Sequence, residues 1–195
     1  MRKAYMFMML SLDGYFEGPN HDISWHSGVD EEFNTFIVDS WLNELDMFMW
    51  GRRTYQFMEE FWPEAESDPK MSKSNLKVAH LMNNTPKMVF SHTLKSVKER
   101  KNWKNVKLVS EFNVDEINKF KKEPGKGIWV GGSELATHFI EAGLIDEFRF
   151  MVNPVIIGKG TPILSGLSHN LKLELIKTHS FKSGNILLCY RPAKG

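Results

Sequence analysis

Three short segments of this 195-residue sequence carry residue types that bind anions such as phosphate. They combine glycine, hydroxyl and basic residues, and each directly follows an apolar run. Glycine lets a ligand approach the main chain, whereas guanidinium and hydroxyl groups donate hydrogen bonds to phosphate oxygens. The segments are Gly131-Gly132-Ser133-Glu134-Leu135, Gly51-Arg52-Arg53-Thr54-Tyr55 and Ser91-His92-Thr93.

The glycine pair at Gly131 and Gly132 stands between a predicted strand and a predicted helix. Without Cβ atoms a phosphate can come close to the main chain, and the first helical N–H groups supply donors at the positive end of the helix dipole. We expect Ser133 to cap this helix or to bond the ligand. A second interpretation stays open, in which the pair only permits a tight strand-to-helix turn.

Two guanidiniums and a hydroxyl follow another predicted strand, at Arg52, Arg53 and Thr54. At a helix start they form a forked donor set that matches phosphate oxygens. The alternative is a basic surface turn whose arginines pair with nearby carboxylates, namely Glu59, Glu60 or Glu64.

The third segment, Ser91 and His92, offers a hydroxyl and an imidazole to a further phosphate. The carboxyl ends of parallel strands are where α/β sheets bind ligands, so one extended polyphosphate would explain all three turns. Their spacing matches neither the G-x-G-x-x-G fingerprint nor the phosphate loop that ends in Gly-Lys-Ser/Thr. Gly158-Lys159-Gly160 lies between strands, and we interpret it as a loop or bulge.

The elements that must position these turns alternate between strand-like and helix-like patterns, which indicates an α/β fold. Helical spacing predicts helices over residues 33–45, 53–61 (ended by Trp62-Pro63), 72–82, 114–122 and 133–142. Extended patterns predict strands over residues 3–10, 46–50, 87–91, 106–109, 128–130, 147–157, 171–181 and 185–191, the last two joined by a turn at Ser183-Gly184. We therefore expect a mainly parallel sheet with helices on its faces and an antiparallel C-terminal edge.

Composition excludes several classes of protein. A net charge of +1 provides no global field that would recruit nucleic acid or an anionic membrane. The single cysteine, Cys189, excludes an intrachain disulfide framework and fits a reducing compartment. The apolar start at residues 4–10 suits a buried strand better than a signal peptide, and no later apolar run approaches a membrane span. We expect one cytoplasmic domain over residues 1–195, and the spacing of the seven histidines predicts no metal site.

Further motifs extend the pattern along nearly the whole chain. They are Ser11-Leu12-Asp13-Gly14-Tyr15-Phe16, Gly18-Pro19, Ile23-Ser24-Trp25, Leu144-Ile145-Asp146-Glu147, Pro154-Val155 and Gly158-Lys159-Gly160-Thr161-Pro162. Together with the three turns, their order resembles dihydrofolate reductase. It resembles more closely the C-terminal reductase domain of bifunctional riboflavin-biosynthesis deaminase/reductases and their free-standing bacterial relatives.

The resemblance implies a dihydrofolate reductase-like three-layer fold that binds NADPH. The pyrophosphate would lie between the turn at residues 131–135 and the turn at residues 52–54. Ser91 and His92, with Arg53, would then lie near the adenosine 2′-phosphate. Main-chain atoms of Met9 and Leu10, together with the side chain of Phe16, would flank the nicotinamide.

The acceptor side of the resemblance is less defined. An acidic residue near the first helix would polarise or protonate the acceptor, and we expect this role for Asp30 or Glu31, with Glu32 a further candidate. The alternative is an acidic helix start without catalytic duty. Trp25 would line the substrate pocket or simply pack in the core. The arginine that pairs with the folate tail is absent and only Lys87 stands nearby, so efficient folate reduction is not expected.

The resemblance therefore implies an NADPH-dependent reductase of a small planar heterocycle, either pterin-like or ribosylaminopyrimidine-like. Hydride transfer requires the protein mainly to hold the cofactor against the acceptor. Two alternatives stay open, a catalytically silent nucleotide-binding protein of the same fold and a cofactor-free interaction module. The apolar C-terminal stretches at residues 148–157 and 186–190 further predict a homodimer.

Overall fold

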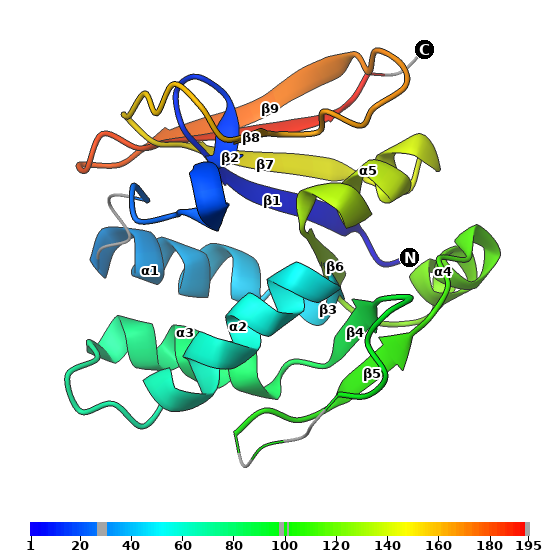
Figure 1. The fold of residues 1–195 in the computed structure, drawn as a ribbon, viewed down its shortest axis with the longest axis horizontal. Coiled ribbons are helices and arrows are strands. Elements are labelled where there is room, and N and C mark those ends of the chain that lie inside the picture. The colour runs from blue at the N-terminus through cyan, green and yellow to red at the C-terminus, as the bar shows by residue number, and fades with distance from the viewer. Residues whose placement is uncertain (27–30, 98–99, 101, 194–195) are drawn as a thin grey trace.

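The computed structural model describes residues 1–26, 31–97, 100 and 102–193, and its centre is an eight-stranded sheet (Figure 1). The strand order is β5-β4-β3-β6-β1-β7-β10-β9. The strands are β1 (Ala4–Leu10), β3 (Leu45–Gly51), β4 (Lys87–Phe90), β5 (Val106–Val109), β6 (Gly127–Gly131), β7 (Glu147–Val152), β9 (Leu173–Ser180) and β10 (Ile186–Pro192). The first six strands in this order are parallel, and β10 runs antiparallel to both β7 and β9. The expected mainly parallel sheet with an antiparallel C-terminal edge is confirmed.

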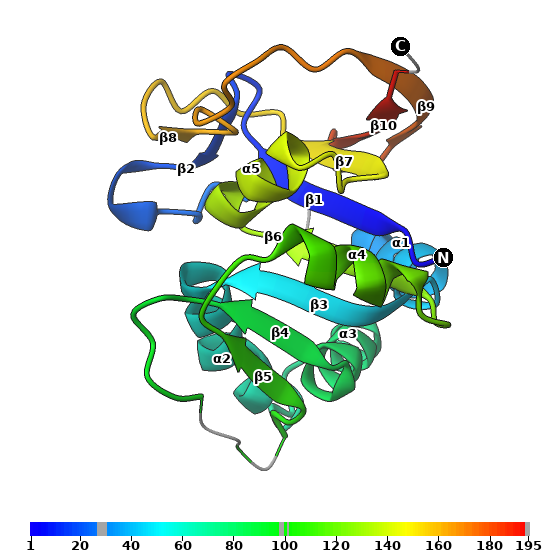
Figure 2. The ribbon, with the colours of Figure 1, turned by 90° about the vertical axis from the view of Figure 1, so that its right-hand side faces the viewer.

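Helices cover both faces of the sheet (Figure 2). One face carries α1 (Glu31–Ile37), the π-helical turn η2 (Val38–Leu42), α2 (Arg52–Ala65) and α3 (Lys73–Asn84), and the other carries α4 (Val114–Lys122) and α5 (Ser133–Glu141). The result is a three-layer, dihydrofolate reductase-like fold. A small separate sheet pairs β2 (Tyr15–Glu17) with β8 (Thr161–Pro162), and a 3-10 turn, η1 (Pro19–His21), follows β2.

The apolar run at the start of the chain is explained by this three-layer arrangement. Successive residues of a strand point to opposite faces, so Tyr5 packs in the cluster beneath α1, α2 and α3, whereas Ala4 and Met6 pack in the cluster beneath α4 and α5. Because both faces of β1 are covered, both sets of positions are apolar.

Three predicted boundaries are wrong by three residues or more. Helix α2 continues through Pro63 to Ala65, since a proline in the last turn removes only one hydrogen-bond donor before the helix ends. The helix expected over residues 33–45 ends at Ile37 and gives way to the π-helical turn. The strand expected over residues 147–157 ends at Val152, because its partner β1 ends at Leu10 and leaves no ladder beyond that pair.

The C-terminal edge also differs from expectation. The apolar stretches of β7 and β10 lie inside the sheet, and their apolar character reflects covered faces rather than a free edge. The edge strand is β9, on which Leu175 and Ile176 are 57% and 46% exposed.

Candidate functional site

The three anion-binding turns predicted from the sequence are neighbours in the structure. They follow β4, β3 and β6, which lie side by side and parallel (Figure 2). Gly51 is in register with Phe90 on one side, and Trp50 with Gly131 on the other. With neighbouring strands about 4.8 Å apart, the three turns begin within roughly 10 Å of one another.

The turn after β6 approaches the turn after β3 so closely that only glycine fits between them. Gly132 has a φ of +95°, and a Cβ atom on it would lie 2.7 Å from Oγ1 of Thr54 and 3.9 Å from the backbone nitrogen of Gly51. A Cβ atom on Gly131 would lie 2.8 Å from Cδ1 of Trp50. The glycine pair therefore does form a tight strand-to-helix turn. This turn brings two helix starts together, at residues 51–54 and 132–135, and we call the surface that they form the cradle.

Two helices begin at this cradle without a side-chain cap. The N-caps of α2 and α5 are Gly51 and Gly132, and neither provides a side-chain acceptor for the first-turn N–H groups. The positive ends of two helix dipoles thus meet at one edge of the sheet, and their first-turn N–H groups have no side-chain acceptor. This arrangement favours the binding of an anion.

The expected cap at Ser133 is wrong. Because Gly132 takes the N-cap position, Ser133 becomes the first helical residue, and its Oγ accepts a hydrogen bond from the backbone N–H of Leu164 at 3.2 Å. Glu134 is exposed in the same turn, whereas Leu135 is buried, with its Cβ 3.8 Å from where a Cβ of Gly51 would lie.

Arg52 and Arg53 are both exposed in the first turn of α2. Within the described part of the chain, neither guanidinium forms an ion pair with Glu59, Glu60 or Glu64. Glu59 faces Arg100 instead, at 3.9 Å between Oε1 and Nε. The alternative, in which these arginines pair with nearby carboxylates, is therefore not observed among the described residues. Two positive charges lie beside the cradle.

The turn after β4 is held by its own serine. The Oγ of Ser91 accepts from the backbone N–H groups of Thr93 and Leu94, at 3.3 and 3.0 Å. His92 is exposed at the tip of this turn. The turn therefore presents an ordered backbone and an exposed imidazole one strand away from Arg52.

The end of β1 lies two strands from β3, next to β6. Met9 is half-buried against the cluster beneath α1, α2 and α3, and Phe16 on β2 is half-buried against the opposite cluster. The carbonyl oxygen of Leu10 accepts from the backbone N–H and Nδ2 of Asn153, at 2.7 and 3.1 Å. Met9 and Phe16 thus bracket the strand end from its two faces.

The acidic residues at the start of α1 are engaged in structural contacts. Oε2 of Glu31 accepts from Oγ of Ser74 on α3 at 2.6 Å, and Oε2 of Glu32 accepts from the backbone N–H of Lys182 at 3.1 Å. Asp30 lies outside the described residues. These contacts tie α1 to α3 and to the turn between β9 and β10.

His26 is a residue that the sequence did not single out. Its ring packs edge-on against Trp25, with 4.3 Å between ring centroids, and burial lowers its pKa. Nε2 is buried without a hydrogen-bond partner, while Trp25 is half-buried and donates from Nε1 to the carbonyl of Asp22 at 3.1 Å. A lone histidine has no spacing signal, so only the structure reveals this neutral imidazole.

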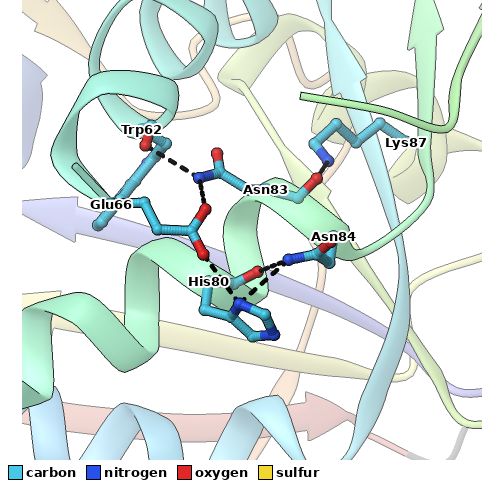
Figure 3. Close-up of polar contacts among 6 residues, drawn as sticks. All are labelled: Trp62, Glu66, His80, Asn83, Asn84 and Lys87. Atoms are coloured by element: carbon cyan, nitrogen blue, oxygen red, sulfur yellow. Dashed lines mark hydrogen bonds and ion pairs between the residues drawn. The ribbon is translucent and has the colours of Figure 1, made fainter. Parts of the chain in front are cut away.

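Lys87 lies at the amino end of β4, away from the three turns. Its ammonium donates to the carbonyls of Asn83 and Thr85 at 2.9 and 2.7 Å and lies 4.2 Å from the ring centroid of Trp103 (Figure 3 shows the bond to Asn83). The side chain is buried, so it is not available to an acidic substrate tail.

Burial lowers the pKa of Lys87 from 10.5 to about 7, which predicts a pH-dependent stability. Between these values the unfolded chain binds a proton that the native chain lacks, so the free energy of unfolding rises with pH. Urea denaturation at about pH 7 and about pH 9 should show that the free energy of unfolding rises with pH by at most ~1.4 kcal/mol per pH unit. We expect Lys87→Met to reduce this slope and Lys107→Met, at an exposed position on β5, to leave it unchanged. An equal slope in the native chain and Lys87→Met contradicts the prediction.

The described residues also bear on membrane insertion and metal binding. No helix there is both long and apolar enough to cross a bilayer. No group of three or more His, Cys, Asp or Glu side chains is placed there so that it could hold a metal ion.

The three-layer fold is shared with a family of reductase-like domains. Residues 2–187 match the family described as the RibD C-terminal domain, and the chain belongs to this family. It is 32% identical over 191 residues to the uncharacterized protein YyaP of Bacillus subtilis, a match that covers 97% of this chain and 94% of the relative. A second Bacillus subtilis protein, YwjB, is 26% identical and covers 92% of each chain.

Solved structures show the same fold at lower identity. A putative riboflavin biosynthesis protein from Shewanella sp. PV-4 has a TM-score of 0.73 at 21% identity and covers 98% of this chain and 99% of its own. The deaminase/5-amino-6-(5-phosphoribosylamino)uracil reductase of Thermotoga maritima has a TM-score of 0.69 at 16% identity. That match covers 98% of this chain but 57% of the bifunctional protein.

Proposed function

We propose that this chain is an NADPH-dependent reductase that transfers a hydride to a small planar heterocycle of the ribosylaminopyrimidine or pterin type. The observation that carries the proposal is the cradle where two uncapped helix starts meet beside two guanidiniums that have no carboxylate partner within the described part of the chain. Membership in the RibD C-terminal domain family supports a pyrimidine reductase-type activity.

The cradle fits the pyrophosphate of a dinucleotide. The glycine pair lets the first turns of α2 and α5 lie close together, so a phosphate in front of the two helix starts would meet their uncapped backbone N–H groups and the hydroxyl of Thr54. When bound, NADPH would supply the hydride. We assign cofactor binding to Met9, Leu10, Phe16, Gly51, Arg52, Arg53, Thr54, Ser91, His92, Gly131, Gly132, Ser133, Glu134 and Leu135.

The chain's own contribution is to hold the cofactor and to orient its nicotinamide against the acceptor. Arg52 and Arg53 neutralise phosphate charge, and the end of β1 with Phe16 orients the nicotinamide against the acceptor. We assign polarisation or protonation of the acceptor to Asp30. Glu31, the other candidate, would have to exchange its hydrogen bond from Ser74 for one to the acceptor. Trp25 is assigned to the wall of the acceptor site.

The burial of Lys87 supports a compact acceptor over folate. Its ammonium already donates to two backbone carbonyls, and a carboxylate tail would have to displace both bonds and enter the core. A ribosylaminopyrimidine-like acceptor is therefore favoured, with a compact pterin as the second candidate.

Assembly and location belong to the same proposal. We propose a single reductase domain over residues 1–195 that acts in the cytoplasm on a small molecule, without metal, nucleic acid or membrane. We also propose a homodimer, whose contact shifts to the exposed β9 edge with Leu175 and Ile176.

The proposal is tested by titrating the native chain with NADPH and NADH while following its melting temperature. A ligand at about 100 times its dissociation constant stabilises a native protein by ~2.7 kcal/mol, and we expect NADPH to do so more strongly than NADH. NADPH oxidation with a panel of aminopyrimidine and pterin acceptors then tests turnover. Binding without any oxidation would support the silent nucleotide-binding protein instead. Failure of both dinucleotides to bind at millimolar concentration would support the interaction module.

A further inference from the structure

Residues 160–169, which we call the strap, run along one face of α5. The helix residues that meet the strap are Ser133, Thr137 and Glu141. Residues spaced by four lie one above another on the same helical face, so these three form a single stripe from the first to the last residue of α5.

Each position of the stripe contacts a different strap residue. Oγ of Ser133 accepts from the N–H of Leu164, and a Cβ on Gly166 would lie 3.6 Å from Cγ2 of Thr137. Glu141 makes the most bonds, because its carboxylate accepts from the backbone N–H of Ser168 at 2.7 Å and from the hydroxyl of the same residue at 2.9 Å. Its Oε2 also lies 3.1 Å from Nδ1 of His169. These hydrogen bonds lower the pKa of Glu141.

The other end of the strap holds β2. Oγ1 of Thr161 donates to Oε1 of Glu17 at 2.8 Å, and the N–H of Ile163 donates to the carbonyl of Gly14 at 3.1 Å. Gly160 packs against the same strand so closely that a Cβ on it would lie 2.1 Å from the carbonyl oxygen of Glu17. The strap therefore joins α5 to the short strand that carries Phe16 (Figure 2 shows β2 beside β8).

An open pocket lies beneath part of the strap, while Ile163, Leu164 and Leu167 pack against the apolar cluster beneath α4 and α5. A cavity of about 360 Å³ lies between Leu164 and Leu167 of the strap and Phe148 and Phe150 of β7. Leu164 also has a φ of +55°, a conformation that non-glycine residues rarely adopt. Polar contacts at both ends therefore act together with this apolar packing to set the path of the strap.

We propose that Glu141 is a positioning residue for the cofactor site. By fixing Ser168 it holds the strap, the strap holds β2, and β2 sets Phe16 relative to the first turn of α5. Glu141 is eight residues from Ser133, or about 12 Å along the helix, so it acts without touching the cofactor. The inference deepens the proposed function and rests on it.

Three variants test the proposal. Glu141→Ala removes the anchor, Glu141→Gln keeps an acceptor oxygen for Ser168, and Asp146→Asn is a control that weakens an unrelated contact with Lys121 and Ala4. Hydrogen exchange of the amides at residues 11–17 is measured without ligand, and the dissociation constant for NADPH is measured by calorimetry.

We expect Glu141→Ala to accelerate exchange at residues 11–17 and to raise the dissociation constant about fivefold. We expect Glu141→Gln to stay within about twofold of the native chain, and Asp146→Asn to lower the melting temperature without changing either readout. A general loss of stability would not reproduce this pattern.

Unchanged exchange in Glu141→Ala overturns the strap proposal, as does an unchanged dissociation constant or an equal effect from Asp146→Asn. Absence of NADPH binding by the native chain is a different result and overturns the proposed function. The two failures are distinguishable because the exchange comparison contains no ligand.

Discussion

Replacing Gly132 with alanine should abolish high-affinity NADPH binding while leaving a folded protein. The new Cβ would lie 2.7 Å from Oγ1 of Thr54, so the two helix starts on which we place the pyrophosphate would have to move apart. The positive φ adds backbone strain, so we expect the free energy of unfolding to fall by ~1–3 kcal/mol. The dissociation constant for NADPH, measured by calorimetry, should rise by at least about tenfold, because one lost charge-assisted hydrogen bond corresponds to ~1.5–3 kcal/mol.

Gly143→Ala is the matched control for this experiment. Gly143 also has a positive φ, at +64°, but a Cβ there would meet nothing within 4 Å. We expect backbone strain to lower the free energy of unfolding of Gly143→Ala while its NADPH affinity stays unchanged, which separates the effect of strain from that of moving the two helix starts apart. Native-like affinity in Gly132→Ala would remove the pyrophosphate from this turn.

Arg52→Ala and Arg53→Ala should each weaken NADPH binding by about 10-fold or more, because each removes a cation from the helix start that faces the phosphates. The variant that lacks the arginine nearer the 2′-phosphate should lose most of its preference for NADPH over NADH, because only NADPH carries that phosphate group. Calorimetric titration of both variants with both dinucleotides measures the two effects.

Arg191→Ala provides the control for charge. Arg191 is exposed on β10 and pairs with Glu174, outside the three turns. We expect its NADPH affinity to match that of the native chain. If Arg52→Ala and Arg53→Ala also bind NADPH with native affinity, the assignment of phosphates to this turn is wrong.

Much of the fold follows from local sequence patterns. The predicted strand at residues 106–109 and helix at residues 114–122 have the observed bounds, because clear turn and cap residues flank them. The meeting of the three turns also follows from sequence, since parallel strands present their carboxyl ends at one edge. What these turns bind remains a prediction.

The details missed by the sequence depend on contacts between distant residues. Ser133 is a residue type that often caps helices, but Gly132 occupies the N-cap position of α5. The hydroxyl of Ser133 accepts a hydrogen bond from the backbone N–H of Leu164 instead. Glu31 has the position of a catalytic acid, but Ser74 on another helix binds its carboxylate. The neutral state of His26 arises from burial, which no local pattern records.

The pairing of β3 with β6 has a consequence for when the cradle exists during synthesis. Trp50 and Gly131 are in register although most of the two helical layers is encoded between them. A nascent chain that has emerged only as far as β5 already contains Arg52 and Arg53, but it lacks β6 and the start of α5, which form the other side of the cradle. If the cradle binds a dinucleotide as proposed, binding must wait for the long-range pairing of β3 with β6, and the dinucleotide can stabilise only chains in which this pairing has formed.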